Sequence, residues 1–375
     1  MKTNGETSVR LLICAGGTGG GVYPAIAVLE ALKGRLSNDT SLQVLWVGGA
    51  GGMEEDLVRR AGIPFQAVPA AGVHGVGIRQ LPGNLLKLAR GAWASRRILR
   101  RFRPDALFFT GGYVAAPMAL AGWRVPTMLY VPDIEPGLAL KFLARFADRI
   151  ALTAAESRRF FSRRARTVVS GYPVRPELLR WKREEARHEF GLSEDLPVLL
   201  VFGGSKGARS INRALLASLH EVLGMAQVIH LSGTLDWPEV EAASRALPEN
   251  LATRYHAFPY LHERMGAALA AADLVLSRAG ASTLGEFPVF GLPAILVPYP
   301  YAWRYQKVNA EYLARHGAAI FLEDASLQDA LLPTLRSLLE EPHKLEAMRK
   351  AMRALATPNA AETIAEQILD LAGKG

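Results

Sequence analysis

The chain of 375 residues has few of the features that cross-link secreted proteins or anchor membrane proteins. It contains one cysteine, Cys14, which excludes a disulfide framework and a cysteine-based metal site. Its uncharged runs, Leu11–Leu29 and Ala106–Trp123, are interrupted by glycines and a proline, whereas a membrane span needs about twenty apolar helix formers. The polar segment Lys2–Arg10 gives no signal peptide. We therefore expect a soluble cytoplasmic protein.

Acidic residues are absent from Leu57 to Pro104, in a chain that contains 35 of them. The same segment carries ten positive charges: Arg59, Arg60, Arg79, Lys87, Arg90, Arg96, Arg97, Arg100, Arg101 and Arg103. One surface of the N-terminal half therefore carries the net charge of +9. Such a surface suits a nucleic acid, an anionic membrane or an acidic substrate.

Apolar residues interleave with these arginines from Val73 to Arg103, and Leu85–Arg103 is predicted to be a helix. A basic amphipathic helix beside an apolar loop favours an anionic membrane surface as partner. A surface helix whose apolar stripe faces its own sheet explains the leucines equally well. Nucleic acid is disfavoured, because no DNA- or RNA-binding motif accompanies the charge.

A chain of this length exceeds one usual hydrophobic core and should form two domains. Each half begins with an apolar strand, a glycine loop and a helix: LLICA, Gly16–Gly21 and Pro24–Leu36 in the first, and Pro197–Phe202, Gly203–Ala208 and Ser210–Leu223 in the second. We predict an α/β protein with two facing Rossmann-like domains and a cleft between them. A nicotinamide enzyme is disfavoured, because the first loop lacks the GxGxxG pattern and no acid ends the second strand.

The domain boundary is predicted at the proline-rich segment Gly171–Pro176. It gives an N-terminal domain of residues 1–170 and a C-terminal domain of residues 171–358. The final helix, 359–371, is expected to pack back onto the first domain.

The segment Ser277–Asn309 is the strongest candidate for a ligand site. It is predicted to contain the end of a buried strand (Asp273–Ser277), a small-residue loop, a helix that ends at Gly291, and a second strand (Ala294–Pro298). The backbone N–H groups at the helix start suit a diphosphate. One turn into the helix, Glu286 can accept hydrogen bonds from two ribose hydroxyls. The segment therefore suits a nucleotide sugar, although a strand, turn and helix also occur throughout α/β proteins.

Two further residue sets extend this site. Gln306 and Asn309 lie one helical turn apart on the following helix and suit neutral contacts to sugar hydroxyls. Asp133 and Glu135 follow the predicted strand Thr127–Val131. Because ligands bind at the carboxyl ends of parallel strands, we expect both carboxylates to face the same crevice as the first glycine loop.

Taken together, the motifs resemble glycosyltransferase family 28, a GT-B family, over nearly the whole chain. They are GGTGG (Gly16–Gly20), GGYVAAP (Gly111–Pro117), GYPVR (Gly171–Arg175), GGSKGA (Gly203–Ala208), SRAGASTLGE (Ser277–Glu286), GLP (Gly291–Pro293) and QxxNA (Gln306–Ala310). Any one is moderately specific, whereas the ordered set at these spacings is strongly so. The resemblance implies transfer of GlcNAc from UDP-GlcNAc to lipid I, an undecaprenyl-diphosphate-linked acceptor, by an enzyme peripheral to the inner face of the cell membrane. It implies no cofactor and no metal.

The resemblance also implies which residues bind the substrates. In the C-terminal domain Arg175, Ser205 and Lys206 would approach the diphosphate, the backbone near His262 the uracil, Glu286 the ribose and Gln306 the GlcNAc hydroxyls. The phosphates would meet the loop Ala281, Ser282, Thr283, Leu284 and Gly285. From the other domain, Thr18, Gly19 and Gly20 would reach the cleft.

Several positions depart from the family pattern. Gly21 stands where the family usually has a histidine, and Tyr130–Asp133 replaces a His-Glu-Gln-Asn run. Lys206 replaces a glutamine, and Trp303 lies where an aspartate is common. The first two changes lie on the acceptor side and leave the identity of the general base open. Our hypothesis is Asp133 or Glu135; the alternative for Asp133 is a turn or a helix cap before Pro136.

Two other functions remain alternatives. One is a GT-B enzyme that uses the same donor with a different lipid or small-molecule acceptor. The other is a nucleotide-sugar-binding protein without catalysis, against which the intact donor set from Arg175 to Gln306 argues.

Overall fold

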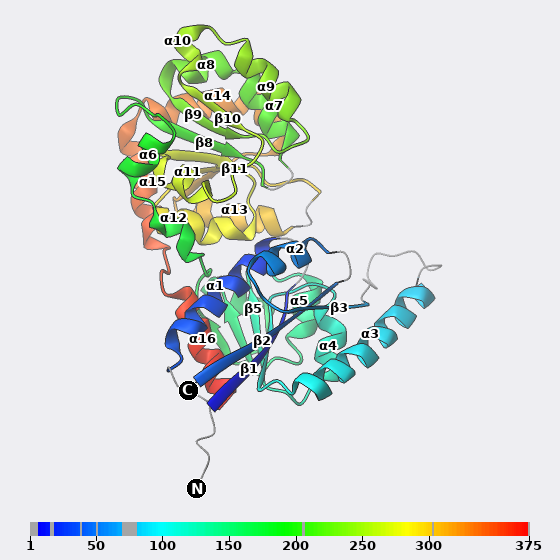
Figure 1. Ribbon diagram of the computed structural model, residues 1–375. Coiled ribbons are helices and arrows are strands. Elements are labelled where there is room, and N and C mark those ends of the chain that lie inside the picture. The colour runs from blue at the N-terminus through cyan, green and yellow to red at the C-terminus, as the bar shows by residue number, and fades with distance from the viewer. Residues whose placement is uncertain are drawn as a thin grey trace. The chain divides into compact units, whose positions relative to one another are not determined.

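The computed structural model describes residues 7–15, 19–37, 40–49, 52–69, 81–204, 207–301 and 304–373. The chain divides into two compact units (Figure 1). Unit 1 comprises Met1–Val174 and Pro358–Gly375, and unit 2 comprises Arg175–Thr357. The last helix, α16 (Ala360–Leu371), belongs to unit 1, where it packs along α1 (Gly19–Arg35).

Unit 1 is built on a seven-stranded parallel sheet with the strand order β3-β2-β1-β4-β5-β6-β7. Its strands are β1 (Thr7–Cys14), β2 (Thr40–Gly49), β3 (Phe65–Val68), β4 (Ala106–Phe109), β5 (Thr127–Val131), β6 (Arg149–Leu152) and β7 (Thr167–Val169). Besides α1 and α16, its helices are α2 (Met53–Arg60), α3 (Leu81–Phe102), α4 (Ala115–Ala121) and α5 (Leu138–Leu143). Every residue of β4 and β5 is buried, because helices cover both faces of a parallel sheet. In Figure 1, α4 lies between α3 and α5, and α16 lies beside α1.

The predicted start of α1 at Pro24 is wrong. The helix begins at Gly19, and Pro24 lies inside it. Of the glycines that were predicted to be a loop, Gly19, Gly20 and Gly21 adopt helical conformation, and the Thr110 hydroxyl donates a hydrogen bond to the Gly21 carbonyl at 2.7 Å. This contact pins the first turn to the end of β4. Pro24 lacks the N–H that would bond the Gly20 carbonyl, so one intrahelical hydrogen bond is missing there.

Unit 2 contains a six-stranded parallel sheet with the strand order β10-β9-β8-β11-β12-β13. Its strands are β8 (Val198–Phe202), β9 (Gln227–Leu231), β10 (Tyr255–Phe258), β11 (Leu274–Ser277), β12 (Ala294–Leu296) and β13 (Ala319–Phe321). Its helices are α6 (Arg183–Glu189), α7 (Arg209–Ala217), α8 (Leu219–Met225), α9 (Trp237–Arg245), α10 (Glu249–Ala252), α11 (Met265–Ala271), α12 (Glu286–Phe290), α13 (Tyr305–Arg315), α14 (Leu327–Leu339) and α15 (Pro342–Ala354).

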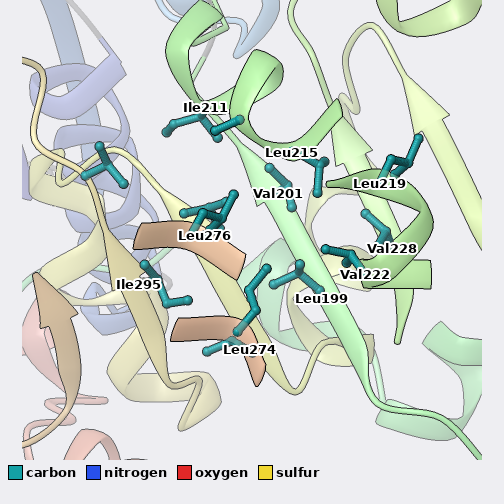
Figure 2. Close-up of a cluster of buried hydrophobic side chains, with 14 of the residues drawn as sticks. Leu199, Val201, Ile211, Leu215, Leu219, Val222, Val228, Leu274, Leu276 and Ile295 are labelled. Atoms are coloured by element: carbon teal, nitrogen blue, oxygen red, sulfur yellow. The ribbon is translucent and has the colours of Figure 1, made fainter. Parts of the chain in front are cut away.

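The single helix predicted over Ser210–Leu223 is two helices, α7 and α8, which meet at Ser218. Its hydroxyl donates to the Ala214 carbonyl at 3.1 Å, a local bond that competes with regular helix geometry. With this break, both α7 and α8 pack side chains against the sheet. Figure 2 shows the resulting core, in which side chains from β8, β11 and β12 meet those of α7 and α8. Full burial of such an aliphatic side chain stabilises the fold by roughly 1.5–3 kcal/mol.

None of the described helices is both long and apolar enough to cross a membrane. The longest of them, α3, has 22 residues and is rich in arginine.

Candidate active site

The strand order of unit 2 reverses between β8 and β11. In open parallel sheets, ligands bind outside the carboxyl ends of the strands at such a switch point. Two segments predicted from the sequence begin there: the second glycine loop after β8, and the segment Arg278–Gly285 after β11. Ser205 and Lys206 lie outside the described residues.

The segment after β11 was predicted to be a small-residue loop followed by a helix. It contains a 3₁₀ helix (Ala281–Leu284) followed by α12. The Thr283 hydroxyl donates to the Gly280 carbonyl at 2.7 Å, and the Thr283 N–H bonds the same oxygen at 3.0 Å. These bonds across three residues tighten the turn. Glu286 is consequently the first residue of α12 and does not lie one turn into a helix. Gly291, with φ 60°, ends α12 as predicted.

Glu286 is the central charged group of this segment. Its side chain is 8% exposed. Burial raises the pKa of its carboxyl group from 4.5 to about 7, although the Arg175 charge and a hydrogen bond with Ser282 act in the opposite direction. The fold thus brings together Arg175, Ser282 and Glu286, all of them predicted site residues. In such a pair, the carboxylate can accept hydrogen bonds from hydroxyl groups, and the guanidinium can bind a phosphate.

The two amides of α13 have different environments. Gln306 is half-buried, and its Oε1 accepts the Tyr299 N–H at 2.8 Å, which fixes its side chain near the end of β12. Asn309 is fully buried and donates to the Ala279 carbonyl at 3.2 Å. The side chain of Asn309 is therefore not accessible to a sugar hydroxyl in this structure. It holds the small-residue loop against α13.

A buried arginine network that sequence reasoning missed fixes the start of the same loop. Arg278, 11% exposed, pairs with Asp324 and donates to the Ser210 hydroxyl at 2.8 Å and to the Val297 carbonyl at 3.1 Å. It thereby ties together α7 and the ends of β11, β12 and β13. In the sequence, an arginine directly after a buried strand is only a weak signal for such a network. Its carboxylate partner also lies far along the chain.

A second buried network lies beneath the loop after β9. His230 is fully buried between the Tyr255 hydroxyl (2.7 Å) and the Asn212 Oδ1 (2.9 Å). Because Oδ1 only accepts, the Nε2 of His230 carries the proton and the tyrosine donates to Nδ1. Burial lowers the pKa of His230 to about 3, so the ring is neutral. The Asn212 amide in turn bonds the Ser232 carbonyl at 2.8 Å, so the network has a structural role.

The remaining donor-side prediction, His262, is exposed on the loop after β10, with its ring 4.7 Å from that of Tyr260.

In unit 1, the strand order reverses between β1 and β4, and Gly19 and Gly20 open α1 beside that point. Thr18 lies outside the described residues.

Asp133 and Glu135 follow β5, the neighbour of β4. Their loop is held rigidly, because Thr153 donates to the Pro132 carbonyl at 2.9 Å and Ser157 to the Ile134 carbonyl at 2.8 Å. Glu135 forms an ion pair with Lys141 at 3.7 Å. Asp133 is half-buried and does not cap α5, whose N-cap residue is Gly137 without a side-chain hydrogen bond.

The second glycine loop gives a matched pair of test positions. Gly204 (φ 87°) and Gly207 (φ 77°) are both left-handed, a conformation that costs an alanine roughly 1–2 kcal/mol. A Cβ on Gly207 would lie 2.2 Å from the Ser232 carbonyl oxygen, whereas one on Gly204 meets no described atom within 4 Å. We expect Gly207→Ala to lower the thermal unfolding midpoint clearly more than Gly204→Ala, as measured by calorimetry. Equal shifts would contradict this account of the loop.

The architecture of two Rossmann-like parallel α/β units is that of GT-B glycosyltransferases. Residues 11–152 match the glycosyltransferase family 28 N-terminal domain, and residues 198–367 match the family 28 C-terminal domain. The chain belongs to glycosyltransferase family 28, and it is a glycosyltransferase. The expected fold class and family are thereby confirmed.

Similar proteins cover essentially the full chain. It is 43% identical to the UDP-N-acetylglucosamine–N-acetylmuramyl-(pentapeptide) pyrophosphoryl-undecaprenol N-acetylglucosamine transferase of Roseiflexus sp. (strain RS-1), over 96% of this chain and 95% of the relative. The protein of the same name from Desulforudis audaxviator (strain MP104C) is 41% identical, over 98% and 100%. The crystal structure of Acinetobacter baumannii MurG superimposes with a TM-score of 0.77 at 27% identity, covering 97% of this chain and 99% of that one.

Proposed function

We propose that the enzyme transfers GlcNAc, with inversion, from UDP-GlcNAc to the MurNAc 4-hydroxyl of lipid I and so forms lipid II. The names of relatives that are 43% and 41% identical over the full chain support this donor and acceptor. The structural observation that carries the proposal is the grouping of Arg175, Ser282 and Glu286 at the switch point of unit 2.

The donor-binding roles follow from this grouping. Glu286, as a carboxylate, accepts hydrogen bonds from the ribose hydroxyls. Arg175 and the N–H groups of the 3₁₀ turn, Ala281 and Ser282, stabilise the diphosphate. Gln306, held by Tyr299, contacts GlcNAc hydroxyls. The Arg278 network and Asn309 position this loop without touching the ligand.

The acceptor oxygen attacks the anomeric carbon of GlcNAc, and the bond from that carbon to the diphosphate breaks. UDP departs with the electron pair, and its charge is stabilised by Arg175. A base takes the proton of the 4-hydroxyl. We assign this role to Asp133, a half-buried carboxylate shortly after the carboxyl end of β5. The rigid loop around Asp133 suits a base that must meet one hydroxyl.

We further propose that unit 1 docks on the anionic inner face of the cell membrane, where lipid I resides. Support comes from Leu120 and Trp123, which are 41% and 62% exposed at the end of α4. The neighbouring helix α3 presents the exposed cations Arg90, Arg96 and Arg100. Exposed apolar side chains beside arginines are typical of a protein that lies on anionic lipid.

Transfer of labelled GlcNAc from UDP-GlcNAc to a lipid I analogue tests the activity, with Glu286→Ala as control. We expect a labelled disaccharide-lipid product that is lost in the control. Donor binding without product would instead favour a different acceptor, which is the alternative raised by Gly21 and Asp133. Absence of donor binding would overturn the proposal.

A further inference from the structure

The strand β2 has an open edge in the described part of unit 1. β1 pairs with β2 from Thr40 to Val47, but β3 pairs with it only from Trp46 onward. Pro64 explains where the pairing stops: its carbonyl accepts the Trp46 N–H at 2.8 Å, but it has no N–H to donate to the preceding part of β2. Residues 40–45 therefore have a neighbouring strand on one side only.

The open edge presents an ordered row of backbone groups. In a parallel sheet, alternate residues direct both their N–H and C=O groups toward the same neighbour. Trp46 faces β3, so Leu42 and Val44 face the same side, beyond the end of β3. The N–H of Thr40 is already bonded to the Ser37 carbonyl at 2.9 Å. Two alternate edge residues, Leu42 and Val44, are thus left to pair with an added strand.

A groove of about 1140 Å³ surrounds this edge. Leu29 and Lys33 of α1 form one wall, and Trp93, Arg97 and Phe102 of α3 form the other. The floor is the edge of β2 with Ile63, Pro64 and Phe65. Its volume exceeds the usual range for ligand pockets, roughly 300–1,000 Å³, which leaves room for a chain segment with side chains on both faces.

The charged residues that line the groove are all positive. Arg10, Lys33, Arg97 and Arg101 line it, and its lining contains no aspartate or glutamate. Among the described residues, none of these four cations forms an ion pair with a carboxylate. The guanidinium of Arg10 lies over the Phe102 ring at 5.1 Å, and its Nε is buried without a hydrogen-bond partner.

We propose that this groove binds an extended acidic segment of a partner protein, which adds to β2 as a further strand. Its backbone pairs with Leu42 and Val44, and its carboxylates, which recur at alternate positions on one face of the added strand, meet the α3 arginines. A lipid anion would meet the charges but not the row of backbone donors and acceptors, so a peptide fits better. The open segment is the amino-terminal part of β2, whereas the candidate active-site loops follow the carboxyl ends of the strands.

The test uses the full-length protein and a fluorescent dodecapeptide of alternating valine and glutamate, with fluorescence anisotropy as readout. We expect saturable binding, and at least about tenfold weaker binding of the matched valine–lysine peptide, because like charges would then meet. Two versions of the acidic peptide, N-methylated at odd or at even residues, separate strand pairing from charge. One should lose binding and the other keep it, since only alternate N–H groups face β2.

Variants of the protein complete the test. Arg97→Glu with Arg101→Glu should weaken peptide binding by at least about tenfold and leave GlcNAc transfer to a water-soluble lipid I analogue, which needs no membrane docking, unchanged. Arg163→Glu, an exposed cation outside the groove, should change neither. Amide exchange at Leu42 and Val44 should slow when the peptide binds. The proposal is overturned if the acidic peptide does not bind, if both methylated peptides bind equally, or if the double variant affects only binding to anionic phospholipid vesicles.

Discussion

Glu286→Gln should weaken UDP-GlcNAc binding at pH 8 by about 10- to 150-fold, as measured by titration calorimetry. The amide keeps the volume of the buried side chain but loses a charged acceptor for the two ribose hydroxyls. Hydrogen bonds to a charged group contribute roughly 1.5–3 kcal/mol, which gives this range. Glu249→Gln, on the exposed start of α10, is the matched control and should bind the donor normally. Unchanged affinity in Glu286→Gln would remove Glu286 from the donor site.

The pH dependence of the same interaction is a second readout. Because burial raises the pKa of Glu286 to about 7, the carboxylate form is lost as the pH falls through 7. Donor affinity of the wild type should therefore be about tenfold lower at pH 6 than at pH 8, and that of Glu286→Gln should stay flat. The pH dependence of folding stability has the opposite sign to that of donor affinity. A raised pKa contributes stability that is complete below the unfolded value of 4.5 and is lost as the pH rises through 7. The unfolding midpoint of Glu286→Gln relative to wild type should thus rise between pH 5 and pH 8.

Asp133→Asn should lower kcat for GlcNAc transfer by roughly 10²–10⁴-fold, the usual contribution of a positioned general base. UDP-GlcNAc affinity should stay within about twofold, because the donor site that we propose lies in unit 2. Both quantities are accessible from steady-state kinetics with a lipid I analogue and from calorimetry with the donor alone.

Glu135→Gln is the matched control for Asp133→Asn. Glu135 is already engaged by Lys141, so its loss should reduce kcat by less than about tenfold. If the two variants show the reverse order, Glu135 is the base. If neither lowers kcat, the base lies elsewhere in the chain.

Much of the fold follows from local patterns in the sequence. Apolar runs such as those of β5 and β8 are predicted correctly as strands, because a parallel sheet covered on both faces requires them. The end of α12 at Gly291 is also confirmed, since a left-handed residue at that position favours glycine. Helix starts were less predictable. Gly19–Gly21 is helical, and its contact with Thr110, far along the chain, has no local signal in the sequence.

The sequence by itself determined the class of this protein: two glycine-loop α/β halves, the family motifs and an acid in the small-residue segment. Only the tertiary structure decided how the site residues act. The fold brings the charge of Arg175 near Glu286, burial moves the pKa of that carboxyl, and Asn309 turns inward to hold a loop. The network of Arg278, Ser210 and Asp324 and the open edge of β2 likewise depend on strand order and on where pairing ends. Periodicity reports which face of a segment is buried, whereas these contacts join segments that no local pattern relates.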